Sequence, residues 1–378
     1  MAPVSDQRPV DPTALTFEGY RRGDGSLGVR NNVLVMPSVI CSHIVADRIA
    51  DATDRAVSVP HDHGCAQIGA DHEQTERTMV NLSQNPNIAG TTVVGLGCEH
   101  LQSDDLAAAI AERDRPVRET AIQAAGGSDA CIEEGTEATR ELARTAESSA
   151  RTEATLSDLT VGVVSSDVEA STREVADPLV GEVVASLLEA GGRVVVAGTE
   201  RLAAHVDTVA ERAANDAAAE SLRAVAERSA SQPGNVRNIV HRSGEHSLES
   251  LTGAWGGAPV EDVLEYGEQA TADGGLSLVD APSRFEEATT ALAAAGASIV
   301  VHVTADGIPT GHPVVPVLKV TGDEATATAL ATDMDVDART ADADEVLRQL
   351  AAVAGGERTA TERHGLTKFA ISRIGPSL

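Results

Sequence analysis

Residues 60–73, with the sequence PHDHGCAQIGADHE, contain three histidines, one cysteine and three acidic residues. Thiolates, imidazoles and carboxylates bind transition metals, and an imidazole also transfers protons near neutral pH. The spacing of these residues is not that of a zinc finger. The stretch therefore predicts a metal site or acid–base catalysis, completed by ligand-type residues from elsewhere in the chain.

Two other stretches place ligand-type residues just after an apolar run. Cys41 follows VLVMPSV, and Cys98 and Glu99 follow TTVVGLG, as His61, His63 and Cys65 follow RAVSVP. Ligands of α/β proteins bind beyond the carboxyl ends of parallel strands, so these residues are expected to meet in one crevice. We expect a metal bound by Cys41, His61, Cys65 and Cys98, with catalysis by His61, His63 and Glu99.

Each of these residues also has a simpler explanation. A buried cysteine packs as a small hydrophobic side chain, and a loop histidine is commonly only polar. Their convergence favours a functional role for the set. Three cysteines could also hold an iron–sulfur cluster with one iron open to substrate, although the spacings of 24 and 33 residues match no cluster motif. We expect Cys131, which lies away from these strand ends, to be simply buried.

The elements that must position these residues follow an α/β pattern. Short runs rich in Val and Ile, such as 31–39, 89–97 and 159–166, alternate with Ala-rich helical stretches such as 103–114 and 178–192. This alternation predicts two mostly parallel, Rossmann-like sheet-and-helix halves. The polar segment 146–159 is the expected boundary, and residues 231–258 form a second irregular zone. The predicted parts are a flexible tail (1–16), an N-terminal half with the metal and substrate site (17–150) and a C-terminal half (151–378).

The composition limits the classes of molecule that the protein is expected to bind. The formal net charge is -29, with acidic residues spread along the whole chain, so nucleic acid and anionic membranes would be repelled. Only two basic residues are lysines, Lys319 and Lys368, which with the acidic surface is typical of a halophilic protein. No signal segment or membrane span is evident, and four cysteines in such a long chain do not indicate a disulfide framework. We expect a cytoplasmic protein that binds small molecules.

Four stretches, in this order, resemble the large domain of the altronate/galactarate dehydratase family. They are FEGYRRGDGSLGVRNNVLVMPSVICSH, HDHGCAQIGADHEQTERTM, NPNIAGTTVVGLGCE and GASIVVHVTADGIPTGHPVVPVLKVTGD. The resemblance covers roughly residues 17–372 and extends to the large subunit of sulfolactate sulfo-lyase.

The resemblance implies a metal-dependent lyase that converts a sugar acid to a 2-keto-3-deoxy acid. The implied metal is iron or a similar divalent ion such as manganese. The substrate is a 2-hydroxy acid, and the protein is expected to form a homo-oligomer. Family members commonly carry a small antifreeze-like (SAF) module, which we expect here as a separate small subunit. Alternatives are a sulfo-lyase acting on sulfolactate, and a family member that binds a metal or acid without catalysis.

The resemblance also suggests substrate-binding residues. Arginine binds carboxylates through two parallel hydrogen bonds, and Arg30 lies in the family's Gly-Val-Arg-Asn turn. The expected substrate-binding residues are Arg22, Arg30, Asn31, Asn32 and Ser166, with Asp167 as a catalytic residue.

The second half of the expected site departs from the family. A Cys-Gly-Gly-Ser-Asp motif is reduced to Ser166 and Asp167 in GVVSSD, and a later lysine-containing motif appears only as EHSLESLTG. Asp306 stands where the family has arginine. These changes could mean a different substrate with fewer anionic groups, or lost catalysis.

The acidic composition makes a prediction about salt. At low ionic strength the Debye length grows from about 3 Å at 1 M to about 30 Å at 0.01 M, so repulsion spreads across the whole surface. The free energy of unfolding should therefore rise with salt over this range, as measured by thermal melts in NaCl and KCl. A melting temperature that is flat between these concentrations contradicts the halophilic interpretation.

Overall fold

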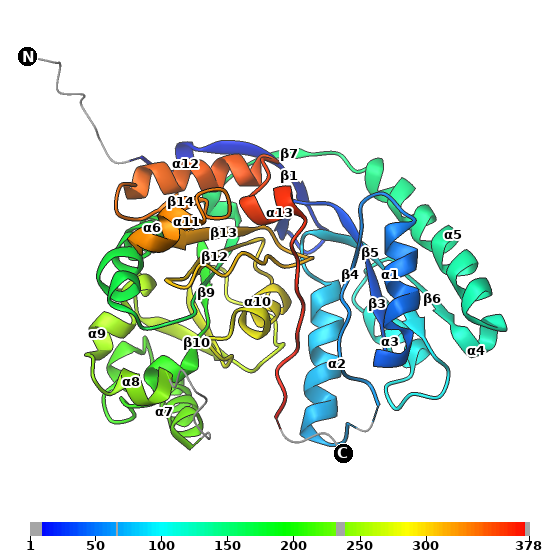
Figure 1. Cartoon of the computed structure of the whole chain (residues 1–378), viewed down its shortest axis with the longest axis horizontal. Coiled ribbons are helices and arrows are strands. Elements are labelled where there is room, and N and C mark those ends of the chain that lie inside the picture. Colours follow the sequence, from blue (N-terminus) through cyan, green and yellow to red (C-terminus); the bar gives the residue numbers. More distant parts are fainter. Residues whose placement is uncertain (1–9, 66, 232–238, 375–378) are drawn as a thin grey trace, which may run out of the picture.

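The computed structural model describes residues 10–65, 67–231 and 239–374. Two parallel sheets, each covered by helices on both faces, make up most of the molecule (Figure 1). The α/β fold class expected from the sequence is confirmed. Residues 1–9 of the expected tail, and 232–238 of the expected irregular zone, lie outside the described residues.

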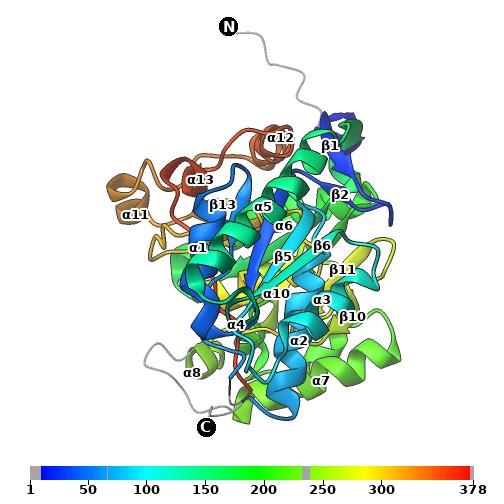
Figure 2. The same ribbon diagram turned by 90° about the vertical axis from the view of Figure 1, so that its right-hand side faces the viewer.

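The first sheet has four parallel strands in the order β4-β3-β5-β6. Side chains of its central strands alternate between two apolar layers, because both faces are buried. Val35 and Val94 pack against α1 and α5, which lie in front of the sheet in Figure 2, while Leu34 and Met36 face the α2 side. The elements are β3 (Asn32–Pro37), β4 (Ala56–Ser58), β5 (Ile88–Gly95), β6 (Val117–Ala121), α1 (His43–Asp51), α2 (Ala70–Ser83), α3 (Ser103–Ala111), α4 (Ile122–Ala125) and α5 (Ser128–Glu147).

The second sheet has seven parallel strands in the order β10-β11-β9-β8-β12-β13-β14. Helices α6, α7 and α12 contribute to the apolar layer on one face, and α10 covers the other. The strands are β8 (Thr160–Ser165), β9 (Arg193–Val196), β10 (Val260–Leu264), β11 (Gly275–Val279), β12 (Ile299–Val303), β13 (Val317–Thr321) and β14 (Val336–Asp337). The helices are α6 (Asp177–Glu189), α7 (Asp216–Ser231), α8 (Ile239–Ser243), α9 (Leu248–Leu251), α10 (Phe285–Ala294), α11 (Glu324–Ala329), α12 (Ala343–Ala354) and α13 (Ala360–His364).

A small antiparallel sheet links the two ends of the N-terminal region. Strand β1 (Thr16–Arg21) pairs with β2 (Leu27–Gly28) on one side and with β7 (Thr152–Thr155) on the other. Strand β7 lies inside the polar segment that the sequence marks as a boundary. None of the helices in the described residues is long and apolar enough to cross a bilayer.

The two large sheets are joined through buried contacts at the amino ends of their strands. Asn87, fully buried just before β5, accepts hydrogen bonds from the backbone N–H groups of Val29 (2.8 Å) and Arg30 (3.1 Å) through Oδ1. Its Nδ2 donates to the carbonyls of Ser298 (2.9 Å) and Val314 (3.2 Å). One side chain therefore satisfies four backbone groups that come from both halves. Beside it, α2 packs against α10 between the sheets (Figure 1).

Replacing Asn87 with Ala should destabilise the whole chain. The four buried backbone groups would lose their partner, at a cost of about 3 kcal/mol or more in the free energy of unfolding. Asn32→Ala is the matched control, since the Asn32 amide lies at the same corner without a hydrogen-bond partner among the described residues, and it should change stability by less than about 0.5 kcal/mol. Equal urea midpoints for the two variants would contradict the role of Asn87.

Candidate functional site

Three loops at the carboxyl edge of the four-stranded sheet carry one cysteine each. Cys65 follows β4, Cys41 follows β3 and Cys98 follows β5, and these strands are neighbours in the order β4-β3-β5. All three thiols are exposed, whereas Cys131 is buried between α1 and α5, as expected. We call residues 38–43, 61–65 and 96–100 the cysteine loops.

The cysteine loops are hydrogen-bonded to one another. The Ile40 N–H donates to the His63 carbonyl (2.9 Å), and the His100 N–H donates to the Gly64 carbonyl (3.2 Å). Gly64 has φ = +94°, and a Cβ there would lie 2.2 Å from the Ser38 carbonyl oxygen. Only glycine allows this close approach. The three strand ends therefore meet, as the sequence pattern indicates.

The thiols influence one another electrostatically. The pKa of Cys65 is raised, first by lost hydration and then by the negative potentials of Cys41, Cys98 and Glu99. Three thiolates close together repel each other unless a cation is present, and thiolates are the preferred ligands of soft metals. The residue types therefore fit an iron-type group. Within residues 10–65, 67–231 and 239–374, however, no three His, Cys, Asp or Glu side chains form a ready-made cage for one ion.

Glu99 holds the cysteine loops rather than offering a free carboxylate. It is 2% exposed and accepts hydrogen bonds from the Ser38 hydroxyl (2.8 Å) and from the N–H groups of Leu96 (3.0 Å), Gly97 (2.6 Å) and Cys98 (2.8 Å). Burial alone would raise the pKa of Glu99, but these hydrogen bonds keep it below its ordinary value. Glu99 is thus an ionised anchor for the loop that carries Cys98.

His61 and His63, expected as acid–base residues, have both ring nitrogens engaged. His61 donates from Nε2 to the Pro37 carbonyl (2.6 Å) and accepts the His63 N–H at Nδ1 (3.1 Å). His63 donates from Nε2 to the Ile371 carbonyl (3.2 Å) and accepts from Gln67 Nε2 at Nδ1 (2.8 Å). Burial lowers the pKa of His61 to about 3 and also lowers that of His63. In this arrangement neither ring has a free nitrogen for a metal or a substrate proton.

Three other histidines lie around the cysteine loops. His43 and His100 follow Cys41 and Cys98 by two residues, and the rings of His72 and His100 meet edge-on with centroids 5.1 Å apart. The buried Nδ1 of His72 has no hydrogen-bond partner among the described residues. No role was expected for these residues from the sequence, although His72 lies within residues 60–73 and His100 directly follows Glu99.

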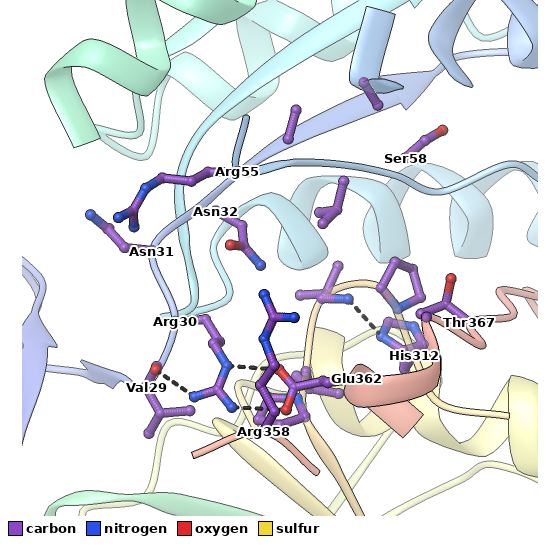
Figure 3. Close-up of a pocket in the computed structure, with 18 of the residues that line it drawn as sticks. Val29, Arg30, Asn31, Asn32, Arg55, Ser58, His312, Arg358, Glu362 and Thr367 are labelled. Atoms are coloured by element: carbon purple, nitrogen blue, oxygen red, sulfur yellow. Dashed lines mark hydrogen bonds and ion pairs between the residues drawn. The ribbon is translucent and has the colours of Figure 1, made fainter. Parts of the chain in front are cut away.

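The expected substrate-binding residues at the start of β3 lie at the opposite end of that strand from Cys41. Arg30, Asn31 and Asn32 line a cleft of about 750 Å³ between the two halves (Figure 3). Strand β3 has six residues, which span roughly 20 Å. These residues therefore do not share a crevice with the cysteine loops.

Arg30 has no donor left for a substrate carboxylate. It pairs with Glu362 through Nε and Nη2 (both 2.8 Å; Figure 3). Its remaining N–H groups donate to the carbonyls of Val29, Val353 and Glu357. Arg22 likewise donates to the Pro86 carbonyl (2.7 Å), and burial lowers its pKa to about 10. Asn31 is buried and donates to the Ala146 carbonyl (2.7 Å). The contacts of Arg30 connect the two halves of the chain, whereas those of Arg22 and Asn31 lie within the N-terminal half.

Ser166 and Asp167 lie on the seven-stranded sheet, directly after β8. Asp167 accepts from the Thr172 hydroxyl (2.6 Å) and from the Ala305 N–H (2.8 Å), so its carboxylate holds the loop after β12 in place. Ser166 is half-buried, with its hydroxyl 3.0 Å from His302 Nε2. Asp306, where the family resemblance expected arginine, is exposed on the loop after β12. No hydrogen bond in the described part of the chain links Ser166 or Asp167 to the cysteine loops.

The ionised state of Glu99 predicts a dependence on pH. A carboxyl whose folded pKa is depressed stabilises the fold above its unfolded pKa of about 4.3, and this stabilisation disappears as pH falls through the folded pKa. Glu99→Gln should lower the unfolding free energy by about 2 kcal/mol at pH 7. That difference should shrink below pH 4.3, and Glu133→Gln, at an exposed position on α5, should show neither effect. Urea midpoints at fixed salt between pH 3 and 7 test this. A difference independent of pH contradicts it.

Comparison of the amino-acid sequence with known proteins identifies the family of this chain. Residues 19–147 match the family model for the second domain of D-galactarate dehydratase/altronate hydrolase, and residues 156–377 match the model for the C-terminal region of D-galactarate/altronate dehydratase. Altronate dehydratase of Bacillus subtilis is 28% identical over 100% of this chain and 81% of its own length. The (2R)-sulfolactate sulfo-lyase subunit beta of Chromohalobacter salexigens is 28% identical over 95% of this chain and 97% of its own length. Altronate dehydratase of Escherichia coli is 27% identical over 98% of this chain and 80% of its own length. The chain belongs to the D-galactarate/altronate dehydratase family.

Proposed function

We propose that this protein is a hydro-lyase that dehydrates a sugar acid of the altronate or galactarate type to a 2-keto-3-deoxy acid. The observation that carries the proposal is the meeting of three exposed cysteines on loops that hydrogen-bond to one another, in a chain of this family. The dehydratase relatives match 88–100% of the chain, so the proposal concerns the whole chain rather than one half.

The proposed cofactor is iron, with manganese as an alternative, held by Cys41, Cys65 and Cys98. A bound divalent ion would act as a Lewis acid toward the carboxylate and hydroxyl oxygens of a 2-hydroxy acid. Glu99 and His61 hold the cysteine loops in place through hydrogen bonds to backbone groups. We do not retain His61 as a ligand, because both its ring nitrogens are engaged.

The residues around the thiols can assist the leaving group. His100 is exposed beside Cys98 and Glu99, and its ring packs against His72. An imidazole near neutrality can donate a proton to a departing hydroxyl. We assign this step to His100 in place of His61 and His63, whose rings are buried and fully hydrogen-bonded.

A separate small subunit is part of the proposal. The sulfo-lyase relative is named as a subunit beta, and this chain matches 97% of its length, whereas it matches 81% of the Bacillus altronate dehydratase. The same length match favours a second candidate function, elimination of sulfite from sulfolactate. The two functions share a 2-hydroxy acid substrate and differ in the leaving group.

The metal assignment predicts the effect of removing single thiols. Cys41→Ala, Cys65→Ala and Cys98→Ala should each lose most of the iron found in protein purified without oxygen, while the melting temperature changes little because these side chains are exposed. Cys131→Ala is the matched control, since this thiol is buried in another place and should leave iron content unchanged. Iron content that is the same in all four variants would refute the site.

A substrate panel tests the reaction. Protein with iron, alone and with the small subunit, should form a 2-keto acid from altronate or galactarate, detected as its semicarbazone. Sulfite release from sulfolactate in the absence of sugar-acid turnover would favour the sulfo-lyase. Iron binding without turnover of any of the three acids would favour a non-catalytic family member.

A further inference from the structure

Three side chains on neighbouring strands of the seven-stranded sheet form a continuous hydrogen-bonded chain. Ser166 follows β8, His302 lies on β12 and Lys319 lies on β13. The Ser166 Oγ is 3.0 Å from His302 Nε2, and His302 Nδ1 is 2.9 Å from Lys319 Nζ. His302 and Lys319 are fully buried, whereas Ser166 is half-buried. The chain therefore runs from the interior toward the surface and ends at a hydroxyl group.

This hydroxyl lies at the point where the strand order of the sheet reverses. From β8 the chain proceeds through β9 to β10 and β11 on one side, and then through β12 to β14 on the other. The carboxyl ends of β8 and β12 therefore border the switch point, where α/β sheets bind their ligands. His302 and Lys319 lie on the face covered by α10, which is the face turned toward the four-stranded sheet (Figure 1).

Lys319 has no counter-ion in contact. In the described part of the chain no carboxylate lies within 4.0 Å of its Nζ, which is placed 3.7 Å from the centroid of the Phe285 ring. Burial lowers the pKa of Lys319 well below its ordinary value, and the more distant carboxylates of Asp335 and Glu286 oppose this only in part. Burial and Lys319 likewise lower the pKa of His302. An amine in this environment gives up its proton more readily than an exposed lysine does, and its neutral form can accept a proton from His302.

Buried hydroxyl groups without partners lie at the same edge. Thr304 directly follows β12, Ser283 follows β11, and both are fully buried with no hydrogen-bond partner among the described residues. A Cβ on Gly198, which follows β9, would lie 3.1 Å from the Ser283 Oγ, so these strand ends are in contact. Buried hydroxyls are normally paired, so these two strand ends keep unused hydrogen-bonding capacity next to the switch point.

We propose that Ser166 is the catalytic base of the lyase reaction and that His302 and Lys319 form the relay that takes up its proton. The reacting C–H of the hydroxy acid then lies at the carboxyl ends of β8 and β12, while its carboxylate and hydroxyl oxygens reach across to the metal proposed at the cysteine loops. The choice of substrate rests on the proposed function, whereas the relay itself does not. Ser166 was expected from the sequence only as a substrate-binding residue, and neither His302 nor Lys319 was expected to take part.

The proton transfers balance along the chain. The C–H bond next to the substrate carboxylate breaks, its electron pair stays on the substrate, and its proton forms a bond to Ser166 Oγ. The original Ser166 hydroxyl proton passes to His302 Nε2, and the proton on His302 Nδ1 passes to Lys319 Nζ. The new ammonium lies over the face of the Phe285 ring, where a cation is stabilised. After elimination the Lys319 ammonium returns its proton through His302 to Ser166 Oγ, and Ser166 releases the proton taken from the substrate to the solvent. His100 regains from the solvent the proton that it gave to the departing hydroxyl, so the resting state is restored.

Lysine labelling tests the relay without any assay of activity. The chain has two lysines, so ¹³C-labelled lysine gives two Cε signals, and Lys368→Arg assigns them. Lys368 is exposed and pairs with Glu286, so its signal is the reference for an ion-paired surface lysine in the same sample. The Lys319 signal should be that of a neutral amine. An ammonium signal from Lys319 at pH 7 would overturn the relay.

Hydrogen exchange tests the base. Wild-type protein with iron, incubated with altronate or galactarate in D₂O, should exchange or eliminate the proton next to the carboxylate. Ser166→Ala should lower this rate by about 100-fold or more, the usual contribution of a general base, with unchanged iron content. Lys319→Met should do the same. Ser165→Ala is the matched control, because the Ser165 hydroxyl bonds Asp177 on the other face of the sheet, and it should stay within a few-fold of wild type.

The outcomes separate the two proposals. Ser166→Ala with a wild-type rate would overturn the assignment of the base. A wild-type protein that acts on none of the acids would overturn the proposed function, and with it the assignment of a hydroxy acid as the molecule that Ser166 deprotonates. The Lys319 signal would still decide whether the relay exists.

Discussion

The arrangement of the two halves depends on one corner of the molecule, where Asn87 satisfies backbone groups from both. Asn85 extends the contact by donating to the carbonyls of Ala293 and Ala297, at the end of α10. Buried backbone groups must be paired, so this corner fixes the amino ends of β3, β5 and β12 beside one another. Each strand then leads away from the corner, and the residues that could bind a metal or transfer protons lie at the carboxyl ends of the strands.

Much of the fold could be predicted from the sequence, because a parallel strand buried on both faces is an apolar run. β3, β5 and β8 coincide with the apolar runs 31–39, 89–97 and 159–166. Strand β6 was missed because, at the edge of its sheet, its sequence VRETA is mostly polar. The pairing of β1 with β7 joins residues more than 130 positions apart, and no local pattern indicates such a contact.

The candidate site was predictable to the level of loops rather than of side chains. Strand-end position indicates that the cysteine loops lie near one another, and these loops are hydrogen-bonded to each other. Strand-end position could not show that both ring nitrogens of His61 and His63 would be hydrogen-bonded to backbone and amide groups. Nor could it show that Arg30 would pair with Glu362, because such partners lie up to 332 residues away in the chain. The sequence does carry a signal for His302 and Lys319. A histidine and a lysine inside the apolar runs IVVHV and VLKVT are polar groups in a buried strand, and such groups need a specific reason to be there.

The identity of residue 319 supports a chemical reason over a packing one. All basic residues in this chain other than Lys319 and Lys368 are arginines. A guanidinium stays charged at any physiological pH, so an arginine at 319 would leave an uncompensated charge beside His302 and Phe285. A leucine or methionine would fill a similar volume with no polar group to bury. Neither alternative provides an amine. Only a lysine at this position can place an amine 2.9 Å from the Nδ1 of His302.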